Sequence, residues 1–362
     1  MTPLRVRPET FGAWVRVDDR TLLAVDRATA ARLGVDGGAR WAEPAVASIA
    51  DATTRPLEVH VAVTSRCPAG CSGCYLDARA DGEHRAFADV AAALDTIAAG
   101  GAFTVAFGGG EPLLHPDLPR IAAHARARGL VPVVTTSGIG LSPERAKALR
   151  DFAQINVSHD GILETRWPEG ARLAERAIEI LVEANIPVGV NVVLTRTLVG
   201  APLLALADRV IALGARELQL LRYKPQGRAA SLDYLARRLT PAQVEALPGL
   251  VAELVARTSV RIDCALVPLL SFERVEDLLA LAVMGCEAGR QLAAVDVHGR
   301  DAPCSFLPGE TSVAEYPARA PEPCSSCPVR VVCRSGCRVV ARHLGGDPFA
   351  PDPECPRVRA SR

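Results

Sequence analysis

The sequence has no long run of apolar residues. Its longest apolar stretches, such as LLALAVMG at 278–285, are much shorter than the roughly 20 residues that cross a bilayer. The start of the chain also lacks a basic segment followed by an apolar one, the pattern of a secretory signal. We therefore expect a cytoplasmic protein that does not engage a membrane.

The sequence also has no excess of charge of either sign. Lys and Arg number 41, as do Asp and Glu, so the formal net charge is zero. This balance gives no electrostatic basis for binding nucleic acid or an acidic membrane surface. The 362 residues, of which 49% are hydrophobic, are sufficient for one large globular domain with an appendage.

Cysteine is plentiful, and its distribution is uneven. Of the 11 cysteines, three lie at 67–74, one at 264 and seven between 286 and 355. In a cytosolic chain, bunched cysteines indicate metal ligands rather than disulfides.

Residues 57–267 alternate between short β-rich runs and longer helical periods, a pattern typical of a parallel sheet covered by helices. We predict an α/β fold, a partial (β/α)6 barrel, with its working residues on the loops that follow the strands. Strands are expected at 57–64, 103–108, 130–136, 153–158, 187–194 and 217–223, with a further strand at 260–267. Helices are expected near 86–99, 116–128, 142–151, 166–185, 201–213 and 240–256.

Three domains are predicted. Residues 1–56 contain a hairpin around Asp18, either a small peptide-docking module or an edge hairpin that caps the barrel; we favour the edge hairpin. Residues 57–270 form the barrel, and 271–362 form a cysteine-rich C-terminal domain.

Two motifs follow the first two predicted strands. Cys67, Cys71 and Cys74 lie in SRCPAGCSGCYLDA, where three thiolates on one loop can hold three irons of a [4Fe–4S] cube and leave the fourth open. A structural zinc site requires a fourth ligand, and no His or Cys lies close enough in sequence to provide one with certainty. The second motif is FGGGEPLLHPDL, after the second strand.

These two motifs in this order resemble the radical S-adenosylmethionine (SAM) superfamily. The resemblance implies that the three cysteines bind a [4Fe–4S] cluster whose open iron is chelated by SAM. It also implies that Gly109, Gly110 and Glu111 form the element that receives the methionine end of SAM. Further candidates for binding the cofactor are Ser158, Asn191, Arg196 and Tyr75. The chain departs from the family pattern at Gly73, where an aromatic residue usually precedes the third cysteine; here Tyr75 follows it.

The C-terminal cysteines resemble the SPASM extension of radical enzymes that mature peptides and proteins. The resemblance implies two auxiliary [4Fe–4S] clusters, and three clusters in all. Cys286, Cys304 and Cys337 are then expected to bind the first auxiliary cluster. Cys324, Cys327, Cys333 and Cys355 are expected to bind the second.

Cys264 stands apart from both groups of C-terminal cysteines. It is either the fourth ligand of the first auxiliary cluster, a thiol that donates a hydrogen atom to the substrate, or a buried structural residue. Arg222, Tyr223 and Lys224 follow the sixth predicted strand. They either orient a carboxylate of the substrate or cofactor or are charges at the rim.

The resemblance implies a radical SAM oxidoreductase that modifies a peptide or protein by crosslinking, thioether formation, dehydrogenation or decarboxylation. A reductant such as flavodoxin or ferredoxin is expected to supply its electrons. One alternative is a radical SAM enzyme for a small molecule, such as a tetrapyrrole propionate. The other is a non-catalytic electron carrier or metal-stabilised scaffold.

Overall fold

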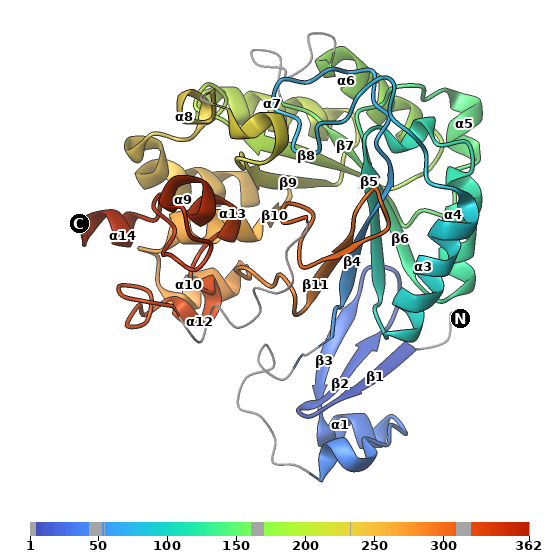
Figure 1. Cartoon of the computed structure of the whole chain (residues 1–362), viewed down its shortest axis with the longest axis horizontal. Coiled ribbons are helices and arrows are strands. Elements are labelled where there is room, and N and C mark those ends of the chain that lie inside the picture. Colours follow the sequence, from blue (N-terminus) through green and yellow to red (C-terminus); the bar gives the residue numbers. More distant parts are fainter. Residues whose placement is uncertain are drawn as a thin grey trace.

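The chain forms a large, mainly parallel sheet, a small antiparallel sheet at its N-terminal end and a cysteine-rich C-terminal segment (Figure 1). The computed structural model describes residues 5–42, 53, 55–160, 170–231, 233–281, 283–308 and 320–361. This arrangement confirms the predicted α/β fold with its N-terminal extension.

The large sheet has the strand order β10-β9-β8-β7-β6-β5-β4-β11-β12. From β4 to β10 each strand lies parallel to its predecessor in the chain, so the sheet is wound in one direction. All the loops that follow these strands therefore lie at one edge. The strands are β4 (Glu58–Thr64), β5 (Thr104–Gly109), β6 (Val131–Thr136), β7 (Gln154–Ser158), β8 (Val188–Leu194), β9 (Glu217–Arg222), β10 (Ser259–Ile262), β11 (Leu292–Val295) and β12 (Asp301–Ala302).

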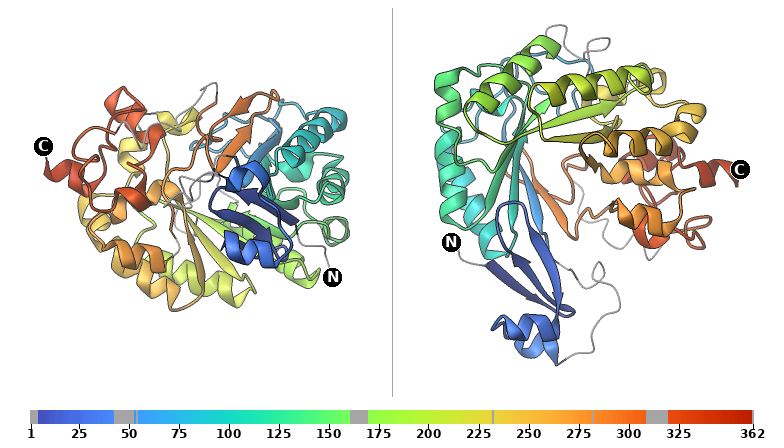
Figure 2. Two further views of the ribbon diagram at one scale, coloured as in Figure 1. Left: turned by 90° about the horizontal axis from the view of Figure 1, so that it is seen from below. Right: turned by 180° about the vertical axis from the view of Figure 1, so that it is seen from behind.

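Helices connect the parallel strands and cover the outer face of the curved sheet (Figures 1 and 2). Two of them begin as the sequence predicts, because the side chains of Ser142 and Thr240 accept hydrogen bonds from the helix backbone ahead of a proline. The helices of the barrel are α3 (Phe87–Ala99), η2 (Pro112–Leu114), α4 (Leu118–Ala127), α5 (Pro143–Lys147), α6 (Gly170–Glu183), α7 (Ala201–Ala212), η3 (Gly227–Ala230), α8 (Asp233–Arg237) and α9 (Pro241–Val255). Residues 166–169 of the predicted fourth helix lie outside the described residues.

Strand β4 shows how alternation in the sequence divides the two faces of the sheet. Val59, Val61 and Val63 are buried and belong to the main hydrophobic core, together with residues of the covering helices. Glu58 and His60 are half-buried on the opposite, concave face. Because successive side chains of a strand point to opposite faces, the concave face receives the polar residues of this strand.

The strand predicted at 260–267 is shorter than expected. It ends at Ile262, and the 3₁₀ helix η4 (Cys264–Leu270) follows. The Asp263 side chain accepts a hydrogen bond from the N–H of Ala265 at 3.3 Å, and this local bond turns the chain out of the strand. Cys264 therefore lies at the start of a helical turn and not inside a strand.

The N-terminal sheet consists of β1 (Arg5–Glu9), β2 (Gly12–Arg16) and β3 (Leu22–Asp26), followed by α1 (Arg27–Arg32) and η1 (Gly38–Trp41). The hairpin predicted around Asp18 joins β2 and β3, and β1 adds a strand that the sequence analysis did not identify.

Three arginines attach this small sheet to the beginnings of the barrel strands. Arg5 and Arg16 donate hydrogen bonds to the carbonyl of Gly129, at 2.7 and 2.8 Å, and Arg7 donates to the carbonyl of Gly101 at 3.0 Å. Gly101 and Gly129 precede β5 and β6. The N-terminal sheet is thus fixed at the edge opposite the loops that follow the strands.

The C-terminal segment continues the large sheet and then packs beside it. β11 pairs in parallel with β4, and β12 pairs antiparallel with β11. Its helices are α10 (Val275–Ala280), α12 (Arg330–Cys333), α13 (Arg338–Gly345) and α14 (Pro356–Ala360). Among the described residues, no helix has both the length and the apolar character that crossing a membrane requires.

Candidate functional site

The first cysteine loop leaves the end of β4 and folds back on itself. The N–H of Cys67 donates to the carbonyl of Arg79 at 2.7 Å, and the N–H of Cys74 donates to the carbonyl of Cys71 at 3.3 Å. Burial raises the pKa of Cys67 to about 11, and the nearby charges of Glu111, Cys71 and Cys74 raise it as well. The three predicted thiols and Glu111 are therefore electrostatic neighbours at this edge of the sheet.

Gly109, the last residue of β5, and Gly110, which follows it, pack directly against the start of this loop. A Cβ added at Gly109, where φ is +126°, meets the carbonyl oxygen of Thr64 at 2.3 Å, and one added at Gly110 meets that of Arg66 at 2.2 Å. The N–H of Gly110 donates to the carbonyl of Thr64 at 2.7 Å. Only glycine allows so close an approach. The glycine run therefore also holds the backbone that leads into Cys67.

Glu111 is 1% exposed and accepts four hydrogen bonds. The donors are the N–H of Leu113 (3.0 Å), the hydroxyl of Thr136 (2.6 Å), and the N–H (2.8 Å) and hydroxyl (2.5 Å) of Ser137. Burial raises the pKa of Glu111, while these hydrogen bonds act in the opposite direction. Its carboxylate joins the loop after β5 to the end of β6.

The structure places Ser158 and Asn191 side by side, whereas the Arg196 side chain binds the backbone around α8 (Asp233–Arg237). Ser158 ends β7 directly opposite Asn191 of β8. The Nδ2 of Asn191 donates to the hydroxyl of Thr135 at 3.3 Å, and its buried Oδ1 has no hydrogen-bond partner among the described residues. The Arg196 guanidinium is exposed and donates to the carbonyls of Leu235 and Arg238.

Tyr75 connects the first cysteine loop to the C-terminal segment. Its ring stacks on Phe306, with centroids 4.4 Å apart and an interplanar angle of 26°. Lys224 Nζ lies 4.2 Å from the centroid of the Phe306 ring and 2.5 Å from Asp263 Oδ2. The Tyr75 hydroxyl lies 3.9 Å from a Cβ added at Gly108, so this ring lies over the end of β5.

Four C-terminal cysteines gather in one region, where Cys264, Cys304 and Cys337 are electrostatic neighbours of Lys224. Cys286, Cys304 and Cys337 belong to one hydrophobic cluster that also contains Ala265. The neighbouring Cys264 interacts electrostatically with Cys286 and Cys304; burial and then the Asp263 charge hold its pKa well above the ordinary thiol value.

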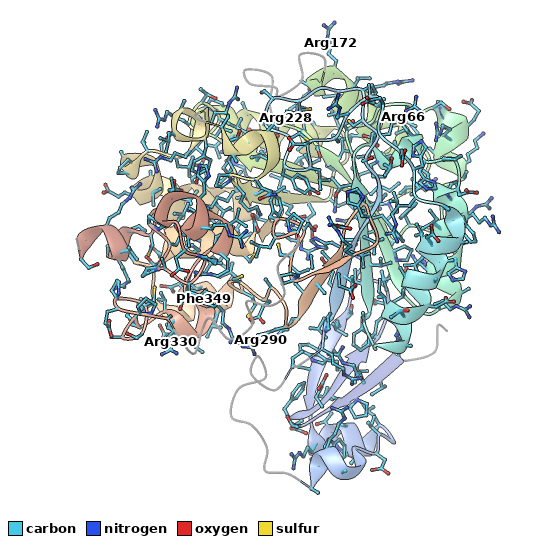
Figure 3. The ribbon with its side chains drawn as sticks, in the orientation of Figure 1. Arg66, Arg172, Arg228, Arg290, Arg330 and Phe349 are labelled. Carbon is cyan, nitrogen blue, oxygen red and sulfur yellow. The ribbon has the colours of Figure 1, made fainter. Side chains whose placement is uncertain are left out.

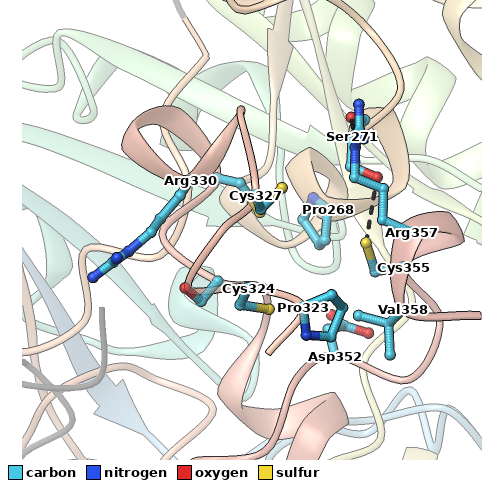
Figure 4. A pocket seen from close by; sticks show the side chains of 13 residues that line it. Pro268, Ser271, Pro323, Cys324, Cys327, Arg330, Asp352, Cys355, Arg357 and Val358 are labelled. Carbon is cyan, nitrogen blue, oxygen red and sulfur yellow. Dashed lines mark hydrogen bonds between the residues drawn. The ribbon is translucent and has the colours of Figure 1, made fainter. Parts of the chain in front are cut away.

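The other four C-terminal cysteines line a single cavity (Figure 4). They are Cys324, Cys327, Cys333 and Cys355, and Asp352 lies among them. The Sγ of Cys355 is 3.3 Å from the hydroxyl oxygen of Ser271. Burial raises the pKa of Cys324 to about 11. Within the described ranges, no three or more His, Cys, Asp or Glu side chains are arranged to hold a single metal ion.

Two features of the site were not identified from the sequence. Arg222, considered as a residue for binding a carboxylate of the substrate or cofactor, is buried in an ion pair with Asp352 and Glu354 of the C-terminal segment. Gly227 and Arg228, which is labelled in Figure 3, contact the first cysteine loop. A glycine followed by a basic residue after the sixth strand was the only sequence signal for this contact.

Comparison with known proteins shows which part of the chain is similar to a protein family and to curated relatives. Residues 61–209 match the Radical SAM superfamily. The chain is 29% identical over 337 residues to the PqqA peptide cyclase of Ruegeria pomeroyi, covering 83% of this chain and 87% of that protein.

Two solved structures share the fold at low sequence identity. The crystal structure of Streptococcus suis SuiB bound to precursor peptide SuiA has a TM-score of 0.69 and 14% identity, covering 98% of both chains. Native anSMEcpe with bound AdoMet and Cp18Cys peptide has a TM-score of 0.62 and 16% identity, covering 84% of this chain and 95% of that one.

Proposed function

Because this chain belongs to the radical SAM superfamily, we propose that it cleaves SAM reductively and uses the resulting radical to oxidise a peptide substrate. The observation that carries this proposal is the meeting of two strand-end loops. The first contains Cys67, Cys71 and Cys74, and the second contains Gly109–Glu111. Both lie at the edge of a parallel sheet where such folds bind ligands.

The donor set fits the cofactors that the superfamily implies. Cysteine thiolates are the usual ligands of iron–sulfur clusters, and three of them lie on one loop with the Glu111 charge beside them. When bound, a reduced [4Fe–4S] cluster would supply the one electron that cleaves SAM into methionine and a 5′-deoxyadenosyl radical, and that radical would abstract a hydrogen atom. We assign cluster binding to Cys67, Cys71 and Cys74.

The residues proposed to bind SAM lie on or next to β5, β7 and β8 and in the first cysteine loop. Asn191 offers a buried carbonyl oxygen that has no hydrogen-bond partner among the described residues, and such an acceptor is well suited to a hydroxyl or amine of a ligand. Ser158 lies opposite it. The backbone of Gly109 and Gly110 and the Tyr75 side chain lie at the end of β5.

Two auxiliary [4Fe–4S] clusters form the finer part of the proposal. Support for the second comes from the single cavity that is lined by Cys324, Cys327, Cys333 and Cys355. Support for the first comes from the shared cluster of Cys286, Cys304 and Cys337. Since Cys264 is an electrostatic neighbour of Cys286 and Cys304, we assign it as the fourth ligand of the first auxiliary cluster.

The proposed substrate is a ribosomally made peptide. The curated relative is named a PqqA peptide cyclase, and the two solved structures contain peptides. The half-buried concave face of the sheet, which carries Glu58 and His60, is the surface we propose for its docking. A one-electron donor such as flavodoxin or ferredoxin is the proposed reductant.

The proposal is tested on anaerobically prepared protein. The iron content is expected to be roughly twelve atoms per chain, the number in three cubes. Dithionite and SAM are expected to yield 5′-deoxyadenosine, and a candidate precursor peptide is expected to lose hydrogen, as measured by mass spectrometry. About two metal atoms or fewer per chain, with zinc present and no 5′-deoxyadenosine, contradicts the enzymatic function and favours a scaffold.

A further inference from the structure

The turn after β9 binds three carbonyls of the first cysteine loop through one residue. The N–H of Arg228 donates to the carbonyl of Cys74 at 2.9 Å, and its Nε donates to that of Cys71, also at 2.9 Å. Both Nη atoms donate to the carbonyl of Ala78 at 3.1 Å. The loop is thus held by a residue 150 to 157 positions later in the chain.

Gly227 brings the two segments into direct backbone contact. Its φ is +58°, and a Cβ added there meets the carbonyl oxygens of Tyr75 and Cys74 at 2.6 and 2.7 Å. A side chain at this position requires the loop or the turn to move, in addition to the strain of the backbone conformation.

The turn is itself fixed at its other end, so it can act as a support. Arg222, the last residue of β9, is buried in the ion pair with Asp352 and Glu354. Lys224 is bound to Asp263 at 2.5 Å and lies over the ring of Phe306. Displacement of the turn therefore has to disturb a buried ionic network.

We propose that Gly227 and Arg228 position the first cysteine loop, setting the conformation in which its thiols meet their cluster and SAM. This inference rests on the proposed function and adds two residues to it. Arg228 binds carbonyls and is thus a positioning residue. Its planar guanidinium suits several carbonyls at once, and small displacements of a supporting group are enough to misplace the groups that act on a ligand.

Replacement of Arg228 tests the side-chain contacts. In iron-loaded Arg228→Ala, the change that SAM causes in the electron paramagnetic resonance spectrum of the reduced first cluster is expected to weaken. The Kd for SAM is expected to rise about tenfold or more, because hydrogen bonds to a charged group are lost. Arg228→Lys is expected to recover part of the spectral change and part of the affinity for SAM.

Arg27→Ala is the matched control for arginine. Arg27 also directs its guanidinium to backbone carbonyls, those of Thr10 and Trp41, but within the N-terminal sheet. The control is expected to leave the spectrum and the Kd for SAM as in the parent. Parent-like SAM binding in Arg228→Ala overturns the proposal. So does equal loss of iron from the auxiliary groups in Arg228→Ala, since that would indicate a general effect on folding.

Replacement of Gly227 tests the same contact without removing the arginine and keeps the proposal testable if Arg228→Ala does not fold. Gly227→Ala is expected to reproduce the spectral change and the weaker SAM binding. Gly34→Ala is its control, because Gly34 has a φ of +79° and an added Cβ there has no atom within 4 Å. Equal effects of the two glycine variants overturn the proposal, since backbone strain alone would then explain them.

The response of the unmodified protein to SAM distinguishes a failure of this inference from a failure of the proposed function. If the parent protein shows no spectral change with SAM, the proposed function fails. If the parent responds and both Arg228→Ala and Gly227→Ala respond equally well, only the positioning role fails.

Discussion

Arg222 and Asp352 form a buried ion pair in which Nη1 and Oδ2 are 2.7 Å apart and the side chains are 4% and 1% exposed. Arg222 ends β9, whereas Asp352 lies between α13 and α14 in the C-terminal segment. Burial is the largest single influence on the pKa of Asp352 and raises it, but the Arg222 charge, the Arg222 hydrogen bond and the backbone hydrogen bonds from Cys337 and Glu354 together outweigh burial and lower the pKa. The pair therefore remains ionised and joins the barrel to the segment that carries the last cysteines.

Removal of one partner of this pair is expected to destabilise the protein strongly. Arg222→Ala leaves the buried Asp352 carboxylate without its cation, while Glu354 keeps Arg238 as a partner. Loss of one partner of a buried ion pair costs about 3–5 kcal/mol. The free energy of unfolding, measured with urea on metal-loaded protein, is the readout. Arg257→Ala is the control, because its pair with Asp208 is 30% and 63% exposed, and solvent-exposed ion pairs contribute far less to stability than buried ones. If the free energy of unfolding falls equally in the two variants, burial does not make the Arg222 pair more important than an exposed pair.

Cys71→Ala is expected to abolish formation of 5′-deoxyadenosine and to remove about four iron atoms, those of one cube. Two thiolates cannot hold a cluster that needs three. Iron analysis and chromatography of the reaction products measure the result. Ser72→Ala, which changes an exposed residue of the same loop, is expected to behave as the parent. Normal 5′-deoxyadenosine formation in Cys71→Ala would refute the ligand role.

Cys264→Ala distinguishes two roles of this thiol. If Cys264 is a ligand, the spectrum of one auxiliary cluster changes, because one of its four thiolates is lost. If instead it donates a hydrogen atom, the spectra and the iron content are unaltered, 5′-deoxyadenosine forms and the product does not. We expect the first result. If product formation and the spectra both match those of the parent, Cys264 is neither a ligand nor a hydrogen-atom donor.

Cys324→Ala tests whether the cavity lined by four cysteines holds an iron–sulfur cluster. It is expected to lower the iron content and to reduce the stability of residues 320–361, because the small hydrophobic cluster around Cys324 consists of Ala320, Val358 and the two cysteines Cys324 and Cys355. Limited proteolysis and iron analysis measure the effects. An iron content and a proteolysis pattern equal to those of the parent would exclude Cys324 as a ligand.

The pH dependence of stability is expected to include a contribution from His159. Burial lowers the pKa of this side chain below its ordinary value of 6.5, although Glu175 acts in the opposite direction. The unfolded chain therefore binds a proton more readily than the folded one, and the free energy of unfolding falls as the pH decreases through 6.5. His159→Gln lacks this part of the slope between about pH 7.5 and 5.5. Identical slopes for the two proteins contradict the expectation.

Much of the barrel was predictable from local patterns. The alternation in β4 and the capping residues Ser142 and Thr240 act over a few residues, and the structure has the elements that they predict. The short strand β10 was not predicted correctly, because the apolar residues after Cys264 suit a buried 3₁₀ helix as well as a buried strand. The Asp263 side chain, by binding the next turn, decides between the two.

The sequence by itself determined which chemistry is available, since the spacing of Cys67, Cys71 and Cys74 and the glycine run before Glu111 are local facts of the chain. Only the tertiary structure decided which distant residues support them. Arg228 reaches the carbonyls of Cys71 and Ala78, and Arg222 reaches Asp352. These contacts join residues 130 to 157 positions apart, and no local pattern encodes such pairing, because it depends on how the strands are ordered in the sheet.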